Sequence, residues 1–173
     1  MDMMQQPTRI VDDWGTQIWQ LATGEIHRTH GPAKIYKNGR LEWWHMGQIH
    51  RTDGPAVTHP GGHETWARHG LLHRTDGPAV INPAHGQQEW WVQGERHRTD
   101  GPALVYCNGP ESWYVHGQLH RLDGPAIMRP EGSQWWWIRG VDVTTLVCTW
   151  MAARQVSWPW DVDTQMEFLL AWS

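Results

Sequence analysis

The chain has 173 residues, a formal net charge of −4 and only 18% charged residues, so it is not a highly charged disordered tail. Tryptophan contributes 15 residues and phenylalanine one, which predicts a folded protein whose apolar bulk is aromatic. No apolar run approaches the ~20 residues of a membrane helix, the N-terminus does not resemble a secretory signal, and two cysteines are too few for a disulfide framework. We therefore expect a protein of the cytoplasm.

A repeated heptapeptide organises most of the chain. The string His-Arg-x-Asp-Gly-Pro-Ala starts at His50, His73, His97 and His120, and a variant with His30 in place of Asp starts at His27. These starts are 23 or 24 residues apart, a glycine lies three residues before each histidine, and one or two aromatic residues precede that glycine. The period predicts five full repeats and one partial repeat between residues 19 and 140.

Each repeat has the pattern of short strands separated by turns. In the second repeat, residues 41–45 form an aromatic strand, Met46-Gly47 a tight turn, and residues 48–51 a returning strand. Asp53-Gly54-Pro55 ends it, because glycine accepts a positive φ and proline donates no ladder hydrogen bond. Two aromatic residues per repeat bury too little surface for one copy to fold alone. We expect a mainly β fold, an elongated stack of hairpin repeats that share a core of tryptophans.

This pattern resembles the MORN repeat, a β-hairpin unit of similar length with an aromatic residue, a glycine and a histidine at fixed spacing. The matching stretches are Trp44-His45-Met46-Gly47-Gln48-Ile49-His50 and Trp91-Val92-Gln93-Gly94-Glu95-Arg96-His97. After the histidine, Arg-x-Asp-Gly-Pro-Ala replaces the Gly-x-Gly of MORN repeats, and this variant is similar to proteins of phages and large viruses. The resemblance implies an open ribbon that acts as a scaffold. Some MORN proteins contact acidic lipids, but Lys34 and Lys37 are the only lysines here.

The last 33 residues lack the glycine-rich period. Thr144-Thr145 are expected to cap a helix reaching Gln155, with Leu146, Trp150 and Ala153 on one face and Val147 and Met151 beside it. Asp161 or Asp163 is expected to cap a second helix that turns Met166, Leu169 and Leu170 inward. The predicted organisation is an N-terminal arm and cap (1–18), the repeats (19–140) and a helical tail (141–173). The tail is interpreted as a cap over the last repeat or as a docking element for a partner, and the two roles are compatible.

The charges are distributed unevenly along the chain. Residues 141–173 carry a net charge of −3, residues 1–20 carry −2, and the repeats are nearly neutral. A protein that binds nucleic acid backbones needs a basic surface, so the sequence argues against generic DNA or RNA binding. The acidic ends instead suit a partner with a basic surface.

The repeated polar residues are the candidate binding residues, together with two tryptophans. In a structural interpretation, each arginine pairs with the aspartate of its own or an adjacent repeat, and each histidine fills a half-buried slot. In a functional interpretation, arginines, histidines and indole faces bind a nucleotide or a peptide. Metal ligation needs three close ligands, and one histidine per repeat does not imply them, so neither a metal nor a cofactor is expected. The candidates are His50, Arg51, Asp53, His73, Arg74, Asp76, His97, Arg98, Asp100, His120, Arg121, Asp123, Trp44 and Trp91.

No catalytic motif accompanies these residues. His-Arg-x-Asp also occurs in the kinase catalytic loop, but the other kinase motifs are absent, and both cysteines are expected to be packing thiols. The first hypothesis is a non-enzymatic interaction protein. In the version that the phage-type resemblance implies, it inhibits a host defence enzyme by binding it. The alternative is a module that traps a nucleotide or signalling molecule, and a third hypothesis is a structural homo-oligomer.

Overall fold

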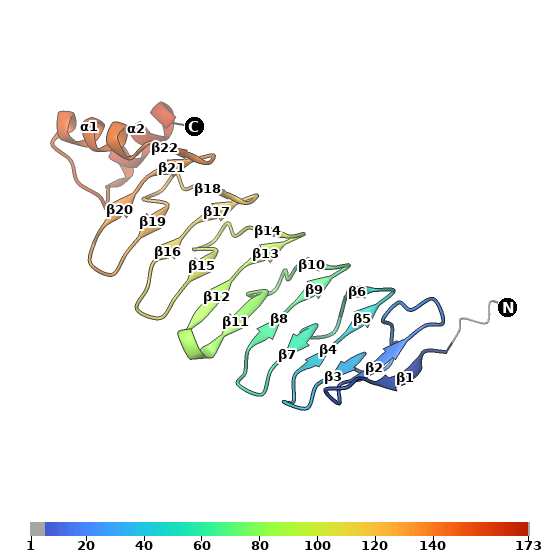
Figure 1. The fold of residues 1–173 in the computed structure, drawn as a ribbon. Coiled ribbons are helices and arrows are strands. Elements are labelled where there is room, and N and C mark those ends of the chain that lie inside the picture. The colour runs from blue at the N-terminus through green and yellow to red at the C-terminus, as the bar shows by residue number, and fades with distance from the viewer. Residues whose placement is uncertain (1–5, 173) are drawn as a thin grey trace. The chain divides into compact units, whose positions relative to one another are not determined.

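A computed structural model describes residues 6–172 of the chain. It contains two compact units, Met1–Gly94 and Glu95–Ser173. The predicted mainly β fold is confirmed, because antiparallel hairpins make up the repeats and two helices follow them at the C-terminal end (Figure 1). Expectations that concern residues 1–5 or Ser173 lie outside the described residues.

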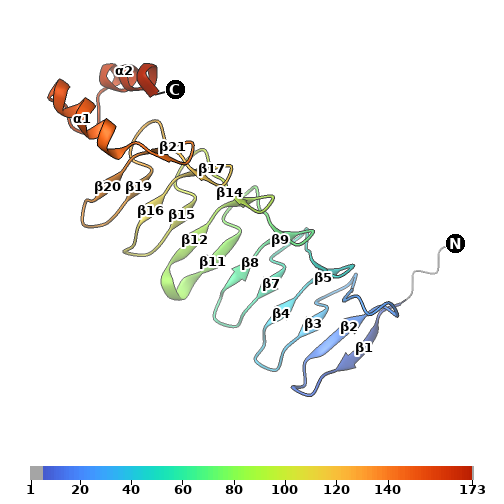
Figure 2. The ribbon, with the colours of Figure 1, turned by 45° about the horizontal axis from the view of Figure 1, so that its top comes forward.

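The first unit is built on one antiparallel sheet, whose strands lie side by side in the order β1-β2-β3-β4-β7-β8-β11-β12. The short hairpins β5–β6 and β9–β10 lie along one margin of this sheet, and the longer turns lie along the other (Figure 2). Each repeat therefore contributes two sheet strands and one short hairpin. The elements are β1 (Thr8–Val11), β2 (Gln17–Gln20), β3 (Lys34–Ile35), β4 (Leu41–Glu42), β5 (Trp44–His45), β6 (Gln48–Ile49), β7 (Val57–Thr58), β8 (Glu64–Thr65), β9 (Ala67–Arg68), β10 (Leu71–Leu72), β11 (Val80–Asn82), a 3-10 turn (Pro83–His85), β12 (Gln87–Glu89) and β13 (Trp91–Val92).

The short hairpins depend on one turn type. Between β5 and β6, Met46 has a φ of 47° and Gly47 a φ of 74°, and a type I′ turn requires positive φ at both central residues. Glycine adopts that conformation at little cost, which explains the glycine three residues before each repeated histidine. The residue before this glycine takes positive φ in the other repeats as well, at His69, Gln93, His116 and Arg139.

The second unit continues the same pattern and ends in helices. Its sheet has the order β15-β16-β19-β20, and β17–β18 and β21–β22 are its short hairpins. Neither helix has the length and apolar character needed to cross a bilayer. The elements are β14 (Glu95–Arg96), β15 (Leu104–Val105), β16 (Glu111–Ser112), β17 (Tyr114–Val115), β18 (Gln118–Leu119), β19 (Ile127–Met128), β20 (Gln134–Trp135), β21 (Trp137–Ile138), β22 (Val141–Asp142), α1 (Thr144–Arg154) and α2 (Val162–Trp172).

The repeats are not packed around tryptophan as the sequence analysis expects. The alanines of the heptapeptide have no exposed surface, whereas the tryptophans of the repeats, apart from Trp136 of the last one, are half-buried. Alanine fits because its backbone joins neighbouring hairpins: Ala56 N–H donates to Thr65 O at 2.8 Å, and Ala56 O accepts from Trp43 N–H at 2.8 Å. A larger side chain would hold those backbones apart. The five alanines are Ala33, Ala56, Ala79, Ala103 and Ala126.

The aromatic core lies instead in the helical cap, which we define as residues 143–172. Trp136 of the last repeat stacks on Trp160 with ring centroids 4.9 Å apart, and Phe168 lies 4.6 Å from Trp160. Val147 of α1 completes this cluster, in which Trp136, Phe168 and Val147 are buried. The cap is fastened to the preceding repeat because Gln165 Nε2 donates to Leu122 O at 2.8 Å.

The helix faces match the prediction in part, because Trp150 of the predicted α1 face, and Met151 beside it, pack against the core cluster. Val147 points inward on α1 while Leu146 is exposed, and on α2 Phe168 is buried while Met166 and Leu170 face solvent. The rings decide this orientation, because Phe168 and Trp172 lie one turn apart and stack with centroids 5.6 Å apart on the inner face.

The predicted helix starts are partly correct. Asp161 caps α2 as expected, accepting a hydrogen bond from Thr164 N–H at 2.8 Å. The cap residue of α1 is Val143, and Thr144 is already inside the helix.

Candidate functional site

The Arg-x-Asp-Gly-Pro segment of each repeat, here called the corner, is organised by its arginine. In the second repeat, Arg51 Nε donates to Asp53 Oδ1 at 2.9 Å and Nη1 donates to Pro55 O at 3.2 Å. The aspartate pairs with the arginine of its own repeat, and this bond lowers the pKa of the Asp53 carboxyl. The same two bonds recur in the corners of Arg74 with Asp76 and Pro78, Arg98 with Asp100 and Pro102, and Arg121 with Asp123 and Pro125.

The guanidinium also lies over an indole. Arg51 Cζ is 4.1 Å from the ring centroid of Trp43, a cation–π contact. On its other side the guanidinium lies against Gly54, where an added Cβ would be 2.8 Å from Arg51 Cζ. The same stacking joins Arg28 to Trp19, Arg74 to Trp66 and Arg121 to Trp113.

The prediction that the corner needs glycine for its positive φ is wrong for the four complete corners. Gly54, Gly77, Gly101 and Gly124 do not have positive φ. In each case the guanidinium of the same corner occupies the space that a Cβ would need. Only Gly31, in the variant first repeat, has the positive φ that the analysis expects of a corner, at 97°.

The repeated histidine joins one repeat to the next. His50 Nδ1 accepts a hydrogen bond from the backbone N–H of His69 at 3.1 Å, and the neighbouring Gly70 N–H donates to Ile49 O at 2.9 Å. An accepting Nδ1 carries no proton, so each ring in this position is neutral with its proton on Nε2. The other histidines in this position are His27 with Met46, His73 with Gln93, His97 with His116 and His120 with Arg139.

The electrostatics favour the neutral ring. Burial lowers the pKa of His27, His50 and His120 below the ordinary value of 6.5, because water no longer solvates the imidazolium. Neighbouring rings add to the effect at His50, whose ring centroid lies 4.3 Å from that of His69 and 5.7 Å from that of His45.

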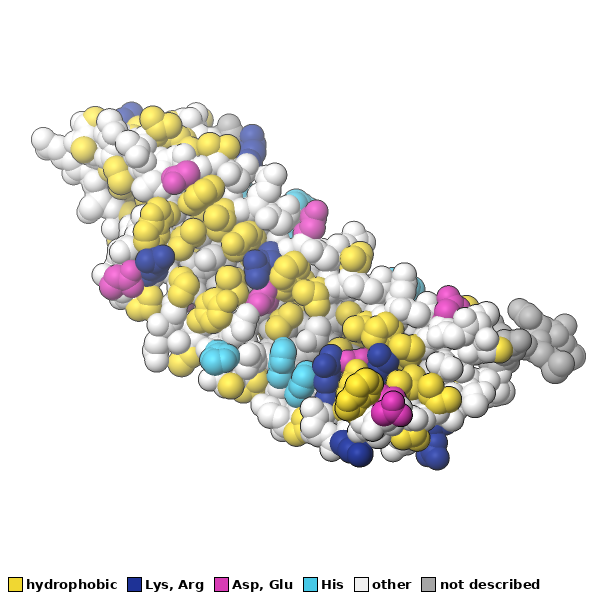
Figure 3. Space-filling view, in the orientation of Figure 1, with side chains coloured by type: hydrophobic (Ala, Val, Ile, Leu, Met, Phe, Trp, Pro, Cys, Tyr) yellow, Lys and Arg dark blue, Asp and Glu magenta, His cyan; other side chains and the backbone are white. Residues whose placement is uncertain are grey.

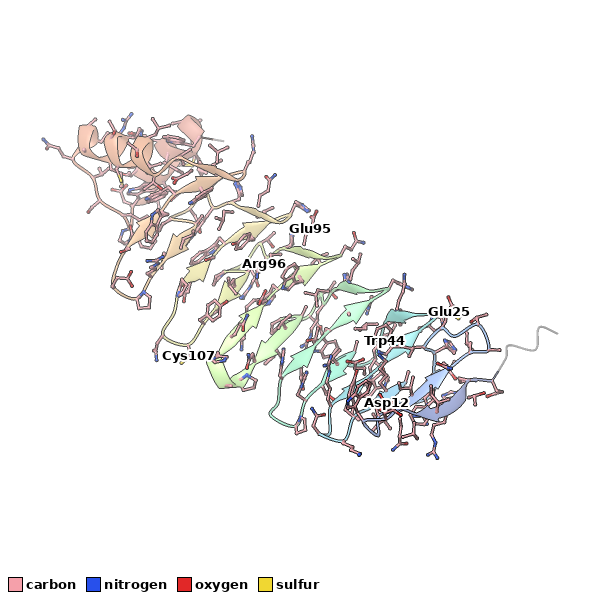
Figure 4. All side chains as sticks on the ribbon, viewed as in Figure 1. Asp12, Glu25, Trp44, Glu95, Arg96 and Cys107 are labelled. Carbon is pink, nitrogen blue, oxygen red and sulfur yellow. The ribbon has the colours of Figure 1, made fainter. Side chains whose placement is uncertain are left out.

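The two candidate tryptophans have buried partners that the sequence analysis missed. Trp44 Nε1 donates to Glu42 Oε2 at 2.8 Å, and Trp91 Nε1 donates to Glu89 Oε2 at 2.9 Å. Both glutamates are buried. The recurring Glu-Trp-Trp triplet at residues 42–44 and 89–91 is the sequence signal that could have identified them. Trp44 lies in the first unit and is labelled in Figure 4.

Shallow hollows lie between successive corners, beside the indoles. Two of them, of about 230 and 210 Å³, are in the first unit, and a third of about 520 Å³ is in the second unit. Each is lined by the corner of one repeat and by the tryptophan, histidine and arginine of the next. The tryptophans that line them are Trp43, Trp66 and Trp113.

A second exposed feature is a row of apolar side chains along α2. Val162, Met166 and Leu170 follow one another at intervals of one helical turn and are 79%, 54% and 82% exposed. Asp163 and Glu167 form an adjacent acidic row, although Glu167 also pairs with Arg154 at 3.0 Å. We call Val162, Met166 and Leu170 the apolar stripe of α2.

Basic, acidic and hydrophobic side chains are interspersed on the face shown in Figure 3, unlike the continuous basic surface that binds nucleic acid. Among residues 6–172, no three His, Cys, Asp or Glu side chains are placed to hold a metal ion. Cys107, at the turn between β15 and β16 (Figure 4), and Cys148 are both exposed, so the expectation that they are packing thiols is wrong.

No protein-family model and no curated protein matches the chain. The likeness of the repeats to MORN repeats therefore remains a resemblance of sequence pattern.

Proposed function

We propose that the protein is a non-enzymatic repeat scaffold that binds another protein through the apolar stripe of α2. The single observation that carries this proposal is the exposure of Val162, Met166 and Leu170 on a helix whose opposite face is already anchored by Phe168. An apolar row at this spacing matches the way an amphipathic helix presents its contacts to a partner.

The polar residues of the repeats support a scaffold rather than an active centre. In the four complete corners the arginine is bonded to its own aspartate and proline carbonyl, in the first corner Arg28 is bonded to the carbonyl of Pro32, and each repeated histidine accepts a backbone hydrogen bond from the next repeat. An active centre needs one asymmetric arrangement of reactive groups, whereas these groups repeat and have structural partners.

The acidic residues of the cap indicate the charge of the partner surface. Asp161, Asp163 and Glu167 lie along α2 beside the apolar stripe, and the cap holds only Arg154 as a basic residue. A partner surface with apolar side chains flanked by lysine or arginine would complement both rows. A phage-encoded inhibitor of a host defence enzyme, acting in the cytoplasm, is the narrower form of this proposal.

The test is a quantitative affinity capture from a lysate of the cell in which the protein acts. Proteins retained by the unmodified chain should be lost with the double variant M166S/L170S and with the charge reversal D163K/E167K. The matched control is L71S, which removes an exposed apolar side chain elsewhere. Retention of the same proteins by M166S/L170S contradicts the proposal.

The second candidate function is binding of a nucleotide, and the hollow of about 520 Å³ in the second unit favours it. That volume is in the range of small-molecule sites, and Trp113 and Arg121 line it. Titration with mono-, di- and cyclic nucleotides should change the tryptophan emission if this is correct. Unchanged emission at millimolar nucleotide rejects it.

A further inference from the structure

The two hollows of the first unit adjoin one another and form a track. Thr52 lines both of them, while Trp43 lines the first and Trp66 the second. Thr52 is exposed, so the residue that the two hollows share is accessible from solvent. At about 230 and 210 Å³ each hollow is smaller than a typical small-molecule site. Their repetition suits successive side chains of one extended chain better than a single small molecule.

The spacing of the hollows selects the conformation of that chain. Each repeat contributes two strands to the sheet, and adjacent strands are about 4.8 Å apart, so equivalent points are separated by roughly 9.6 Å. Three residues of a polyproline II helix advance about 9.3 Å and return to the same face. Three residues of a β-strand cover a similar length, but the third then points to the opposite face. An α-helix needs about six residues for this distance and does not return to the same face.

The chemistry of the track fits the same conformation. The bonds of Arg51 and Arg74 to their own corners use Nε and Nη1, so the Nη2 hydrogens remain for a ligand. A polyproline II chain has no internal hydrogen bonds, and its carbonyl oxygens are free to accept them. Proline rings pack against indoles and bring no backbone N–H that needs an acceptor.

The paired charges of the track disfavour a polyanion at two of its three corners. Arg51 pairs with Asp53 and Arg74 pairs with Asp76 at 2.9 and 2.8 Å, so these two corners have no net charge, whereas the corner of Arg28 has His30 in place of the aspartate. A polyanion such as a nucleic acid would meet a carboxylate beside Arg51 and beside Arg74. A neutral, proline-rich segment meets donors and indoles without that repulsion.

We propose that the first unit binds a proline-rich segment of another protein in the polyproline II conformation, with every third residue entering successive hollows between the corners of Arg28, Arg51 and Arg74. This surface is separate from the apolar stripe of α2 and does not depend on it.

The test uses two synthetic peptides of equal length, (Pro-Pro-Ala)₄ and (Gly-Gly-Ala)₄, titrated into the full chain while tryptophan emission is recorded. The proline peptide should bind at least tenfold more tightly than the glycine peptide. T52R, which places a long side chain between the two hollows, should weaken binding of the proline peptide at least tenfold. Q88R is the matched control, because it adds the same side chain at an exposed residue of β12, which does not line the track, and should leave binding unchanged.

Three outcomes would overturn the proposal: no binding of the proline peptide at millimolar concentration, equal binding of the glycine peptide, or full binding by T52R. Binding of single-stranded DNA to the same hollows, blocked by T52R, would also overturn it. M166S/L170S separates the two proposals, because it should abolish capture of the partner while leaving the proline peptide bound.

Discussion

In the repeats before Trp136 the fully buried side chains are the heptapeptide alanines and Pro125, whereas in the cap Phe168 and Val147 are buried together with Trp136 of the last repeat. The repeats are joined by backbone hydrogen bonds and by histidine Nδ1 atoms, and within each of the repeats of Trp19, Trp43, Trp66 and Trp113 an arginine stacks on the indole. The cap is joined by packed rings. Within a periodic stack, each repeat makes polar contacts with the repeat that follows it. The last repeat has no following neighbour, and the apolar side chains of the cap cover it instead.

The largest effect is expected in the cap. Phe168→Ala should lower the free energy of unfolding by about 3–5 kcal/mol, because it removes a fully buried ring from the centre of the cluster. Urea denaturation followed by tryptophan fluorescence measures it. Leu170→Ala, on the exposed side of the same helix, should stay within about 0.5 kcal/mol of the unmodified protein. Equal losses for the two variants would mean that the cap has no aromatic core.

In the repeats the most damaging small change should be at the corner. Gly54→Ala should cost about 1–3 kcal/mol, because its Cβ would displace the Arg51 guanidinium from Trp43. Gly61→Ala is the control, since nothing lies within 4 Å of the added Cβ. A double-mutant cycle with Arg51→Ala should show that the two changes are not additive. If the stability losses of the two variants are additive, displacement of the Arg51 guanidinium is not the reason that Gly54→Ala is destabilising.

The histidine contact should make stability depend on pH. Because the folded-state pKa of His27, His50 and His120 lies below 6.5, the unfolded chain takes up protons first as the pH falls. Stability should be greatest above pH 6.5 and should decrease as the pH falls through the lowered folded-state pKa values. Denaturation at pH 7.5 and at pH 5 measures this difference, and a higher stability at pH 5 would reverse the assigned sign.

His50→Ala isolates one of these contacts. At neutral pH it should cost about 1 kcal/mol, because the backbone N–H of His69 loses its acceptor. The dependence of stability on pH should also become weaker than in the unmodified protein. A variant with unchanged stability and unchanged pH dependence would show that the His50 ring does not contribute to the contact between the two repeats.

The smallest effect is expected at the exposed aspartates. Asp53→Asn keeps the shape of the corner and removes only the charge, and Asp53 is largely exposed to solvent that screens its pair with Arg51. The midpoint of thermal unfolding should barely move. A loss as large as that of Gly54→Ala would mean that the ion pair, rather than the stacked guanidinium, holds the corner.

The sequence was sufficient for the fold because its period, its glycine turns and its proline corners are local signals. It identified the strands, the tight turn at Met46-Gly47, and Asp161 as one of two candidates for the cap of α2. It did not reveal which side chains the repeats bury, because tryptophan and alanine recur with the same period. The distance between neighbouring backbones decides which of the two is buried, and a sequence does not give that distance.

The sequence also did not determine which face of each cap helix points toward the core. Leu146 and Val147 on α1, and Leu170 and Phe168 on α2, are equally plausible inward residues by pattern, and the choice depends on where the rings of Trp136 and Trp160 lie. Among the candidate binding residues, the sequence indicated that each arginine pairs with an aspartate, and the structure shows that Arg51 takes Asp53 of its own repeat rather than that of a neighbour. The sequence did not indicate the bond of His50 to a backbone 19 residues away, because that bond depends on the stacking of two repeats.

The most direct test of the central claim, that polar contacts between neighbouring repeats hold the stack, is amide hydrogen exchange measured residue by residue. The amides of His69 and Gly70 lie in an exposed tight turn and yet donate to His50 Nδ1 and Ile49 O of the preceding repeat. They should exchange slowly at neutral pH, and His69 should lose this protection in the variant His50→Ala. Exchange at both amides as fast as at Gly61, at the tip of a neighbouring turn, would contradict the account.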